Sequence, residues 1–416
     1  MSKEKRRVPK LRFPGFTEDW EQRKLNDLVT IRRGLTYKPS DIAENGIRVL
    51  RSSNIDEDQF ITSNDDVFVN IEAVNIPFAK NGDILITSAN GSNRLVGKHT
   101  IIRDIADNSA VHGGFMLLAE SNNPLFTDAL LSSNWYKRFI NTYVAGGNGA
   151  IGNLSKSDLE SQIVMVPSEH EQAKIGQWYD NINQLITLHQ RKLDNLKLKK
   201  KALLQKLFPK NGERYPELRF PGFTDAWEQR KLIDIAKTFI GLVTTMTENY
   251  RDSGTLLIRN SDIKEGQFLF SENPIHLDEE FAEKNKTRRL QIGDVVTVHT
   301  GDIGTSAVIE EKEAGAIGFA TINTRTDKSI LNPYFLATYF NTEKHKCYAN
   351  SVSTGDGRSN YNIKDFNKLV ISVPTLDEQE RISVLINDIN IIITLHQRKL
   401  DHLKLQKKAL LQQMFV

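Results

Sequence analysis

Two glycine-containing segments have residues that could hold a nucleotide. Residues 147–152 have the three-glycine spacing of a dinucleotide-binding loop, and residues 91–99 partly match a phosphate-binding loop. The first precedes a short polar turn instead of joining a strand to a long helix, and its counterpart at 355–360 lacks the third glycine. The second has one residue too many, and His99 stands where Ser or Thr would hold Mg²⁺. We interpret both segments as ordinary loops.

Two further patterns could modify or cut DNA. Asn-Pro-Leu-Phe at 123–126 and Asn-Pro-Tyr-Phe at 332–335 are similar to the Asn-Pro-Pro-aromatic motif of amino-methyltransferases, but they lack the second proline. Both stand where a helical pattern begins, so helix capping explains them better. Asp302 followed by the Glu-Glu-Lys of 310–312 has the order of a nuclease site, but the first half of the chain has no counterpart. We therefore expect no catalytic residues in this chain.

Polar loop residues are better candidates, and they suit the recognition of duplex DNA. Lys and Arg bind phosphates, whereas Arg, Asn, Gln, Ser, Thr or His on loops of a rigid sheet can reach base edges. The candidates in the first half are Arg32, Arg33, Tyr37, Lys38, Arg51, Ser88, Asn90, Ser92, Asn93, Arg94, Lys98 and His99. Those in the second half are Arg259, Asn260, His299, Thr300, Arg358 and Asn360. Each residue alone could be a solvated loop residue, but the set favours DNA contact.

These candidates lie on two copies of one framework. Leu-Arg-Phe-Pro-Gly-Phe-Thr at 11–17 recurs at 218–224, an offset of 207 residues (218 minus 11). Trp-Glu-Gln-Arg-Lys-Leu at 20–25 recurs at 227–232, and the nine residues 186–194 return unchanged at 393–401, all at the same offset. The chain is therefore a tandem duplication.

Between the matching ends the two halves differ in residue choice but keep one order of signals. Each has an early glycine, a Gly-Asp turn before an apolar run at 82–87 or 293–298, and a helical pattern with Pro in its first turn. We predict an α+β fold of two mixed α/β globules, at 1–168 and 209–374, each followed by one long helix.

The two long helices are predicted at 169–208 and 375–416. Residues 169–207 contain no Pro and one Gly, and would span roughly 58 Å at about 1.5 Å per residue. Seam residues alternate in steps of three and four with one stutter, at 175, 178, 182, 185, 189, 193, 196, 200, 203 and 207, and again from 382 to 414. We expect the copies to pack antiparallel as a coiled-coil strut in a pseudo-twofold molecule.

Polar residues on these helices leave several interpretations open. The lysine-rich runs at 197–201 and 404–408 could follow DNA, or could solvate a helix face and balance acidic partners, which we favour. His189 and His396 occupy equivalent seam positions, where a polar pair more often fixes helix register than forms a pH switch or a metal site.

Composition sets the class of protein without choosing the function. A chain of 416 residues is comfortable for two domains, and a net charge of +3 is only weak evidence for a nucleic-acid partner. The single cysteine, Cys347, and the lack of zinc-ligand spacing indicate a reducing compartment, and no segment has the length and apolarity of a membrane span. We expect a cytoplasmic protein without a metal.

The arrangement resembles the specificity subunit of type I restriction-modification systems. The resemblance rests on the repeated Leu-Arg-Phe-Pro-Gly-Phe, the strands that end at Pro167 and Pro374 with Glu-Gln close behind, and the coiled helices that follow. It covers the whole chain, and its specificity comes from two variable domains separated by repeated helices.

The resemblance implies a bacterial defence protein that is not itself the catalyst. Each globule would be a target recognition domain that binds one half of a split, asymmetric DNA site. The helices would set the spacer and dock two methylation subunits, near Trp20 and Trp227, with restriction subunits joining them. S-adenosylmethionine, ATP and Mg²⁺ would be bound by those partners, and none by this chain. The alternatives are a stand-alone nuclease or methyltransferase, and a structural adaptor that does not bind DNA.

Overall fold

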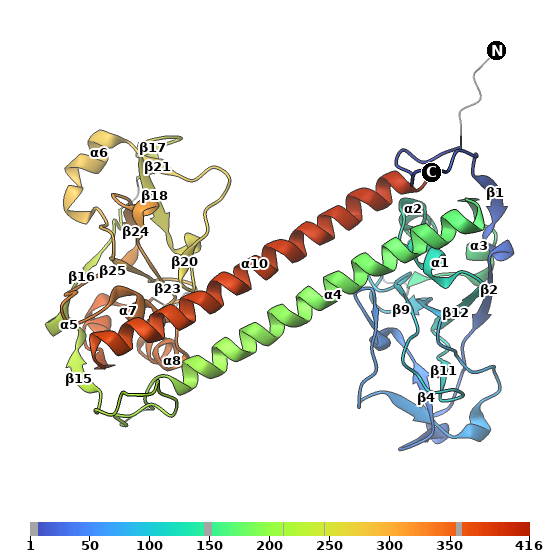
Figure 1. The fold of residues 1–416 in the computed structure, drawn as a ribbon, viewed down its shortest axis with the longest axis horizontal. Helices are drawn as coiled ribbons and strands as arrows, with labels where there is room; N and C mark the ends of the chain where they lie inside the picture. The colour runs from blue at the N-terminus through green and yellow to red at the C-terminus, as the bar shows by residue number, and fades with distance from the viewer. Residues whose placement is uncertain (1–6, 145–151, 211, 245, 355–359) are drawn as a thin grey trace, which may run out of the picture. The chain divides into compact units, whose positions relative to one another are not determined.

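The computed structural model describes residues 7–144, 152–210, 212–244, 246–354 and 360–416 (Figure 1). It forms two compact units. The first unit consists of residues 1–190 and 398–416, and the second of residues 191–397. Each unit therefore combines the globule of one half with one end of both long helices.

The first unit is built on two four-stranded sheets, with strand orders β10-β8-β12-β2 and β11-β4-β7-β3. Only the pairing of β11 with β4 is parallel among these ladders. Strand β8 is buried throughout, as the apolar run after the Gly-Asp turn predicts. The strands are β2 (Val29–Arg33), β3 (Ile42–Ala43), β4 (Ile47–Leu50), β7 (Val67–Val69), β8 (Ile84–Thr87), β10 (His99–Ile101), β11 (Ala110–His112) and β12 (Met116–Ser121).

Shorter elements complete the first unit. Two-stranded pairs join β1 (Glu21–Lys24) to β14 (Ile163–Val166), β5 (Ile55–Asp56) to β6 (Gln59–Phe60), and β9 (Ala89–Asn90) to β13 (Gly152–Asn153). The short helices are α1 (Pro124–Leu131), α2 (Asn134–Tyr143) and α3 (Lys156–Glu160). The Asn123 side chain accepts a hydrogen bond from the Phe126 backbone N–H, which confirms that Asn-Pro-Leu-Phe is a helix cap.

The second unit repeats this topology. Its sheets have the orders β16-β25-β22-β23 and β17-β21-β18-β24, which match those of the first unit strand for strand. The sheet strands are β16 (Ala236–Ile240), β17 (Tyr250–Arg251), β18 (Thr255–Arg259), β21 (His276–Leu277), β22 (Val295–Val298), β23 (Ser306–Val308), β24 (Ile317–Phe319) and β25 (Thr321–Thr326). The paired short strands are β15 (Glu228–Lys231) with β26 (Val370–Val373), and β19 (Ile263–Lys264) with β20 (Gln267–Phe268). The short helices are α5 (Leu232–Ile235), α6 (Glu279–Lys284), α7 (Pro333–Phe340), α8 (Glu343–Val352) and α9 (Ile363–Phe366).

One glycine in each unit explains a signal that the sequence repeats. A Cβ on Gly34 would lie 1.9 Å from the backbone oxygen of Gly113, and a Cβ on Gly241 would lie 2.1 Å from that of Gly318. No larger residue fits where these backbones meet. The early glycine of each half therefore holds the chain that follows it against the parallel strand pair.

The long helices are α4 (Glu169–Lys206) and α10 (Leu376–Met414). In the first unit the beginning of α4 packs with the end of α10, since Ile175 and Tyr179 share a core with Leu411 and Met414. In the second unit the end of α4 packs with the beginning of α10, since Leu204 and Leu207 share a core with Ile382 and Ile386. Each unit by itself therefore contains an antiparallel helix pair.

The predicted seam is wrong at two equivalent positions. Leu185 is 46% exposed in the first unit and Ile392 is 42% exposed in the second. Near the globules, Tyr179 and Ile386 are buried beside the predicted seam residues Trp178 and Leu385. Tyr179 and Ile386 are buried because each helix packs there against its own globule as well as against the other helix, which widens the buried stripe.

Among the residues that the structure describes, no helix is long and apolar enough to cross a membrane. The same residues contain no group of three His, Cys, Asp or Glu side chains that could hold a metal ion.

Candidate nucleic-acid interface

Three of the predicted DNA-contacting residues of the first unit line one pocket. Tyr37, Arg51 and Asn90 come from three separate segments and surround a cavity of about 690 Å³. The Asn90 side-chain N–H donates to the Ser52 hydroxyl at 3.1 Å, which links two of these segments. We call this place, where residues 51–52, 88–90 and 115 meet, the first junction.

The remaining candidates of the first unit are placed unevenly. Arg33, Lys38, Ser92, Asn93 and Arg94 are exposed, so their side chains are available to a ligand. Ser88 is buried, and its backbone serves the fold: its N–H donates to the Phe115 oxygen, and its oxygen accepts from the Leu154 N–H.

Lys98 and His99 follow the loop of residues 91–97, and their side chains are partly or fully buried. Lys98 is half-buried. His99 is buried, with its ring nitrogens near the Gly97 oxygen and the Ser132 hydroxyl. His99 therefore has a structural position.

The predicted residues of the second unit that the structure describes are linked by hydrogen bonds. The Asn260 side-chain oxygen accepts from the His299 backbone N–H at 2.9 Å, and its N–H donates to the Ala320 oxygen. The Thr300 hydroxyl donates to the Asn360 side chain at 2.8 Å and contacts His299 Nδ1. Burial lowers the pKa of His299, which favours a neutral ring. We call the place where residues 260, 299–300, 320 and 360 meet the second junction. Arg358 lies outside the described residues.

The two junctions share one backbone frame. Leu154 N–H donates to the Ser88 oxygen at 2.7 Å in the first, and Tyr361 N–H donates to the His299 oxygen at 2.9 Å in the second. Thr87 pairs with Met116 as Val298 pairs with Thr321, so Phe115 and Ala320 are equivalent. The two units therefore present different side chains from equivalent positions.

An arginine at equivalent positions has a different partner in each unit. Arg259 donates from Nε and Nη2 to the two Asp262 carboxylate oxygens at 3.1 and 3.0 Å, and this pairing raises its pKa. At the Asp262 position the first unit has Asn54; both side chains accept the arginine backbone N–H, but only Asp262 also binds the arginine side chain. The Arg51 side chain is exposed, without an ion pair to any described residue. Arg51 is thus the freer of the two cations.

Trp20 and Trp227, predicted to lie near a partner surface, have core positions. They are 2% and 1% exposed and pack edge-on against Phe415 and Phe208, respectively. Any partner surface here must be formed by the exposed residues around these side chains.

Comparison with known proteins decides the family. The model for the type I restriction modification DNA specificity domain matches residues 17–198 and again residues 224–405. The chain belongs to the type I restriction-modification specificity family. Each matched segment contains one globule and most of the long helix that follows it, which agrees with the tandem duplication.

Individual relatives agree with this family. The specificity subunit of the type I restriction enzyme StySPI from Salmonella potsdam is 25% identical over 382 residues, covering 88% of this chain and 81% of that protein. The MjaVIII specificity subunit of Methanocaldococcus jannaschii is 23% identical over 198 residues, covering 46% of this chain and 45% of that protein.

Solved structures share the fold. The S subunit of a type I restriction-modification system from M. genitalium aligns with 98% of this chain and 99% of its own, with a TM-score of 0.59 and 14% identity. A chain from a structure concerned with complex assembly and conformational transition of a type I system aligns with 97% of this chain and 98% of its own, with a TM-score of 0.50 and 16% identity.

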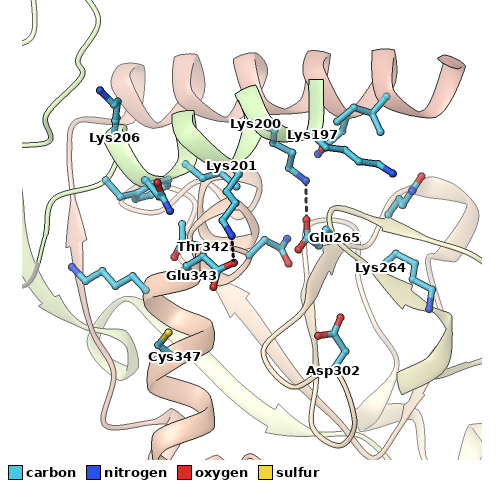
Figure 2. A pocket seen from close by; sticks show the side chains of 18 of the residues that line it. Lys197, Lys200, Lys201, Lys206, Lys264, Glu265, Asp302, Thr342, Glu343 and Cys347 are labelled. Atoms are coloured by element: carbon cyan, nitrogen blue, oxygen red, sulfur yellow. Dashed lines mark hydrogen bonds and ion pairs between the residues drawn. The ribbon is translucent and has the colours of Figure 1, made fainter. Parts of the chain in front are cut away.

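Lysines of the two helix runs pair with acidic side chains of the globules. In the second unit a cavity of about 1250 Å³ lies beside the end of α4, and Figure 2 shows Lys200 reaching Glu265 and Lys201 reaching Glu343 across it. In the first unit the equivalent Lys407 pairs with Asp58 at 2.6 Å. These contacts support the interpretation that the lysines balance acidic groups.

Sequence reasoning missed two residues of the first junction. Phe115 is 72% exposed beside the pocket, and Ser52 lies on its rim. The one available signal is the pair Gly113-Gly114, which marks a loop just before Phe115. A single aromatic residue in a loop has no periodicity that would distinguish it from a core residue.

Proposed function

We propose that this specificity subunit binds one half of a bipartite, asymmetric DNA site with each unit. The observation that carries the proposal is the pair of junctions, in which one backbone frame presents Arg51, Asn90 and Phe115 in one unit and Arg259, Gly301 and Ala320 in the other. Different side chains on equal frames suit two different half-sites.

The subunit works without catalytic residues of its own in this proposal. Methylation and restriction subunits would supply the chemistry and bind S-adenosylmethionine, ATP and Mg²⁺. Two methylation subunits would dock on the long helices and on exposed surface around Trp20 and Trp227. Because its substrate is cellular DNA, we expect the complex in the cytoplasm.

The long helices would set the distance between the half-sites. We propose the functional division 1–168, 169–208, 209–374 and 375–416, with recognition domains alternating with spacer helices. Inserting one heptad into a helix should change the preferred spacer length, since about seven residues add roughly 10 Å.

The test is methylome sequencing of cells that carry this chain with its partner subunits. The modified motif should have two half-sites separated by a spacer. Replacing residues 88–94 by another loop should change only one half-site. A continuous motif would contradict the two-site model, and cleavage or methylation by the purified chain alone would favour a stand-alone enzyme. A complex without sequence-dependent DNA binding would favour a structural adaptor.

A further inference from the structure

Phe115 stands on the surface with a fixed backbone. Its side chain is 72% exposed, whereas its backbone oxygen accepts hydrogen bonds from Ser88 N–H at 2.9 Å and Ala89 N–H at 3.1 Å. The next residue, Met116, donates from its N–H to the Gly113 oxygen at 2.8 Å and begins β12. The backbone that carries the ring is therefore fixed by hydrogen bonds, and the ring itself lies on the surface.

The pocket beside Phe115 combines an apolar wall with a polar rim. Leu35, Pro39, Ile42 and Met116 contribute apolar side chains, and Gly113 and Gly114 contribute backbone. Arg51, Ser52 and Asn90 supply hydrogen-bonding groups around them. A ligand that fits this place needs one apolar group next to polar groups.

The charges around the pocket favour an anionic partner. Arg51 and Lys38 are exposed cations at or next to the rim, and none of the residues that line the cavity is acidic. Duplex DNA has phosphates for these cations and base edges for Asn90 and Arg51. The apolar group that a base pair presents in the major groove is the 5-methyl group of thymine, and phenylalanine is a known contact for it.

The second unit has a different side chain at the position of Phe115. Ala320 replaces Phe115, and the Asn260 side chain bridges the Ala320 oxygen and the His299 N–H across the same place. Gly301 stands where the first unit has Asn90. The exposed phenylalanine at this position is therefore a feature of the first unit.

We propose that Phe115 and the adjoining pocket recognise the 5-methyl group of a thymine in the first half-site. The proposal rests on the proposed function, since it assumes that the first unit binds DNA. It deepens that function by assigning one specificity-determining residue and the chemical group that it contacts.

The experiment removes the methyl group from the DNA and the ring from the protein separately. The complex is assembled from the full chain and its methylation subunits, and its affinity is measured for targets in which deoxyuridine replaces one thymine at a time. For one thymine of the first half-site the wild-type complex should lose about fourfold in affinity, because one buried methyl group is removed. With Phe115→Ala that replacement should have no effect.

Two controls keep the result specific. Thymines of the second half-site should give the same deoxyuridine effect in wild type and in Phe115→Ala, because that unit is unchanged. Phe115→Leu should retain part of the effect, because it keeps an apolar side chain. Since the Phe115 side chain is exposed, both variants are expected to fold and assemble like wild type, which thermal unfolding of the complex checks.

The proposal is overturned if the first half-site contains no thymine, or if every deoxyuridine effect is the same with Phe and with Ala at position 115. In either case sequence-specific binding through both units would persist, and the proposed function would stand. Loss of sequence dependence at both half-sites of the wild-type complex would instead overturn the proposed function and this inference with it.

Discussion

The two units have the same frame and different surfaces, and the difference shows which residues are constrained. The hydrogen bonds that close the junctions, Leu154 to Ser88 and Tyr361 to His299, are equivalent, and so are the sheet orders. The side chains next to these bonds differ, as Phe115 and Ala320 do. Backbone hydrogen bonds do not depend on side-chain identity, so a junction can change its surface chemistry without losing its shape.

Each unit contains an equivalent buried ion pair. Breaking this pair should give the largest effect of the changes proposed for comparing the two units. Arg12 binds both carboxylate oxygens of Glu171, and Arg219 binds those of Glu378 in the same way. Glu171 and Glu378 are each 1% exposed. Replacing one arginine leaves a buried carboxylate without its partner, so Arg12→Met and Arg219→Met should each destabilise their own unit by about 3–5 kcal/mol. Urea unfolding followed by hydrogen exchange of peptides from each unit measures this.

A matched control exists in both units. Arg23 with Glu21, and Arg230 with Glu228, are equivalent pairs on exposed strands. Arg23→Met and Arg230→Met should leave stability unchanged, because solvent screens such pairs. If Arg12→Met and Arg219→Met caused strongly different losses of stability, the ion pair would not contribute equally to the two units.

The order of elements could be predicted from the sequence, whereas their pairing could not. Gly-Asp turns, apolar runs and Asn-Pro caps are local signals, and they correctly place β8, β22, α1 and α7. The parallel pairing of β4 with β11 joins segments about 60 residues apart, and no local pattern encodes it. The burial of Tyr179 beside the predicted seam is not encoded locally either, since the packing of a globule on its helix is a tertiary effect.

The units should differ in their response to acid. Burial lowers the pKa of His112 in the first unit and of His345 in the second to about 4, so both rings are neutral when folded and protonate when unfolded. Their contribution is complete above pH 6.5 and is lost as the pH falls toward 4, by up to about 3 kcal/mol for each ring. Burial raises the pKa of Asp128 to about 6, so this carboxyl becomes favourable in the folded state over the same range.

The first unit should therefore lose less stability than the second between pH 6.5 and 4.5. Hydrogen exchange of α1 and α8 peptides, corrected for the intrinsic pH dependence of exchange, compares the two units. Asp128→Asn removes the compensating carboxyl and should make the first unit more acid-sensitive than it is in the wild type. An unchanged acid sensitivity of the first unit in Asp128→Asn would contradict the assignment of Asp128 as the compensating group.

The candidate site could be predicted as a set of loops but not as a surface. Tyr37, Arg51 and Asn90 were found because their residue types suit DNA, and the fold brings them to one pocket. Ser88 has a suitable type but is buried, because the loop it begins is closed by backbone hydrogen bonds. Exposure of a side chain depends on which distant segment covers it, and this information is missing from residue type and spacing.

Arg51 and Arg259, the arginines of the two junctions, should differ in how much they contribute to DNA binding, and this is the smallest of the expected effects. Asp262 neutralises and holds the Arg259 guanidinium group, whereas the Arg51 side chain is exposed at the first junction. A cation already paired within the protein gains less from a phosphate or a guanine edge, because it must give up its partner. Arg51→Ala should therefore cost the assembled complex about 1–3 kcal/mol in binding its target, and Arg259→Ala less than about 1 kcal/mol.

The salt dependence of binding decides which contact Arg51 makes. If Arg51 binds a phosphate, Arg51→Ala should weaken all DNA sequences alike and reduce the slope of log affinity against log salt by about one. If it binds a guanine, only targets with the correct base at one position of the first half-site should lose affinity. Asp262→Asn should release Arg259 and bring its alanine effect closer to that of Arg51. An Arg259→Ala effect as large as that of Arg51→Ala in the wild-type background would show that the Asp262 pair does not distinguish the two junctions.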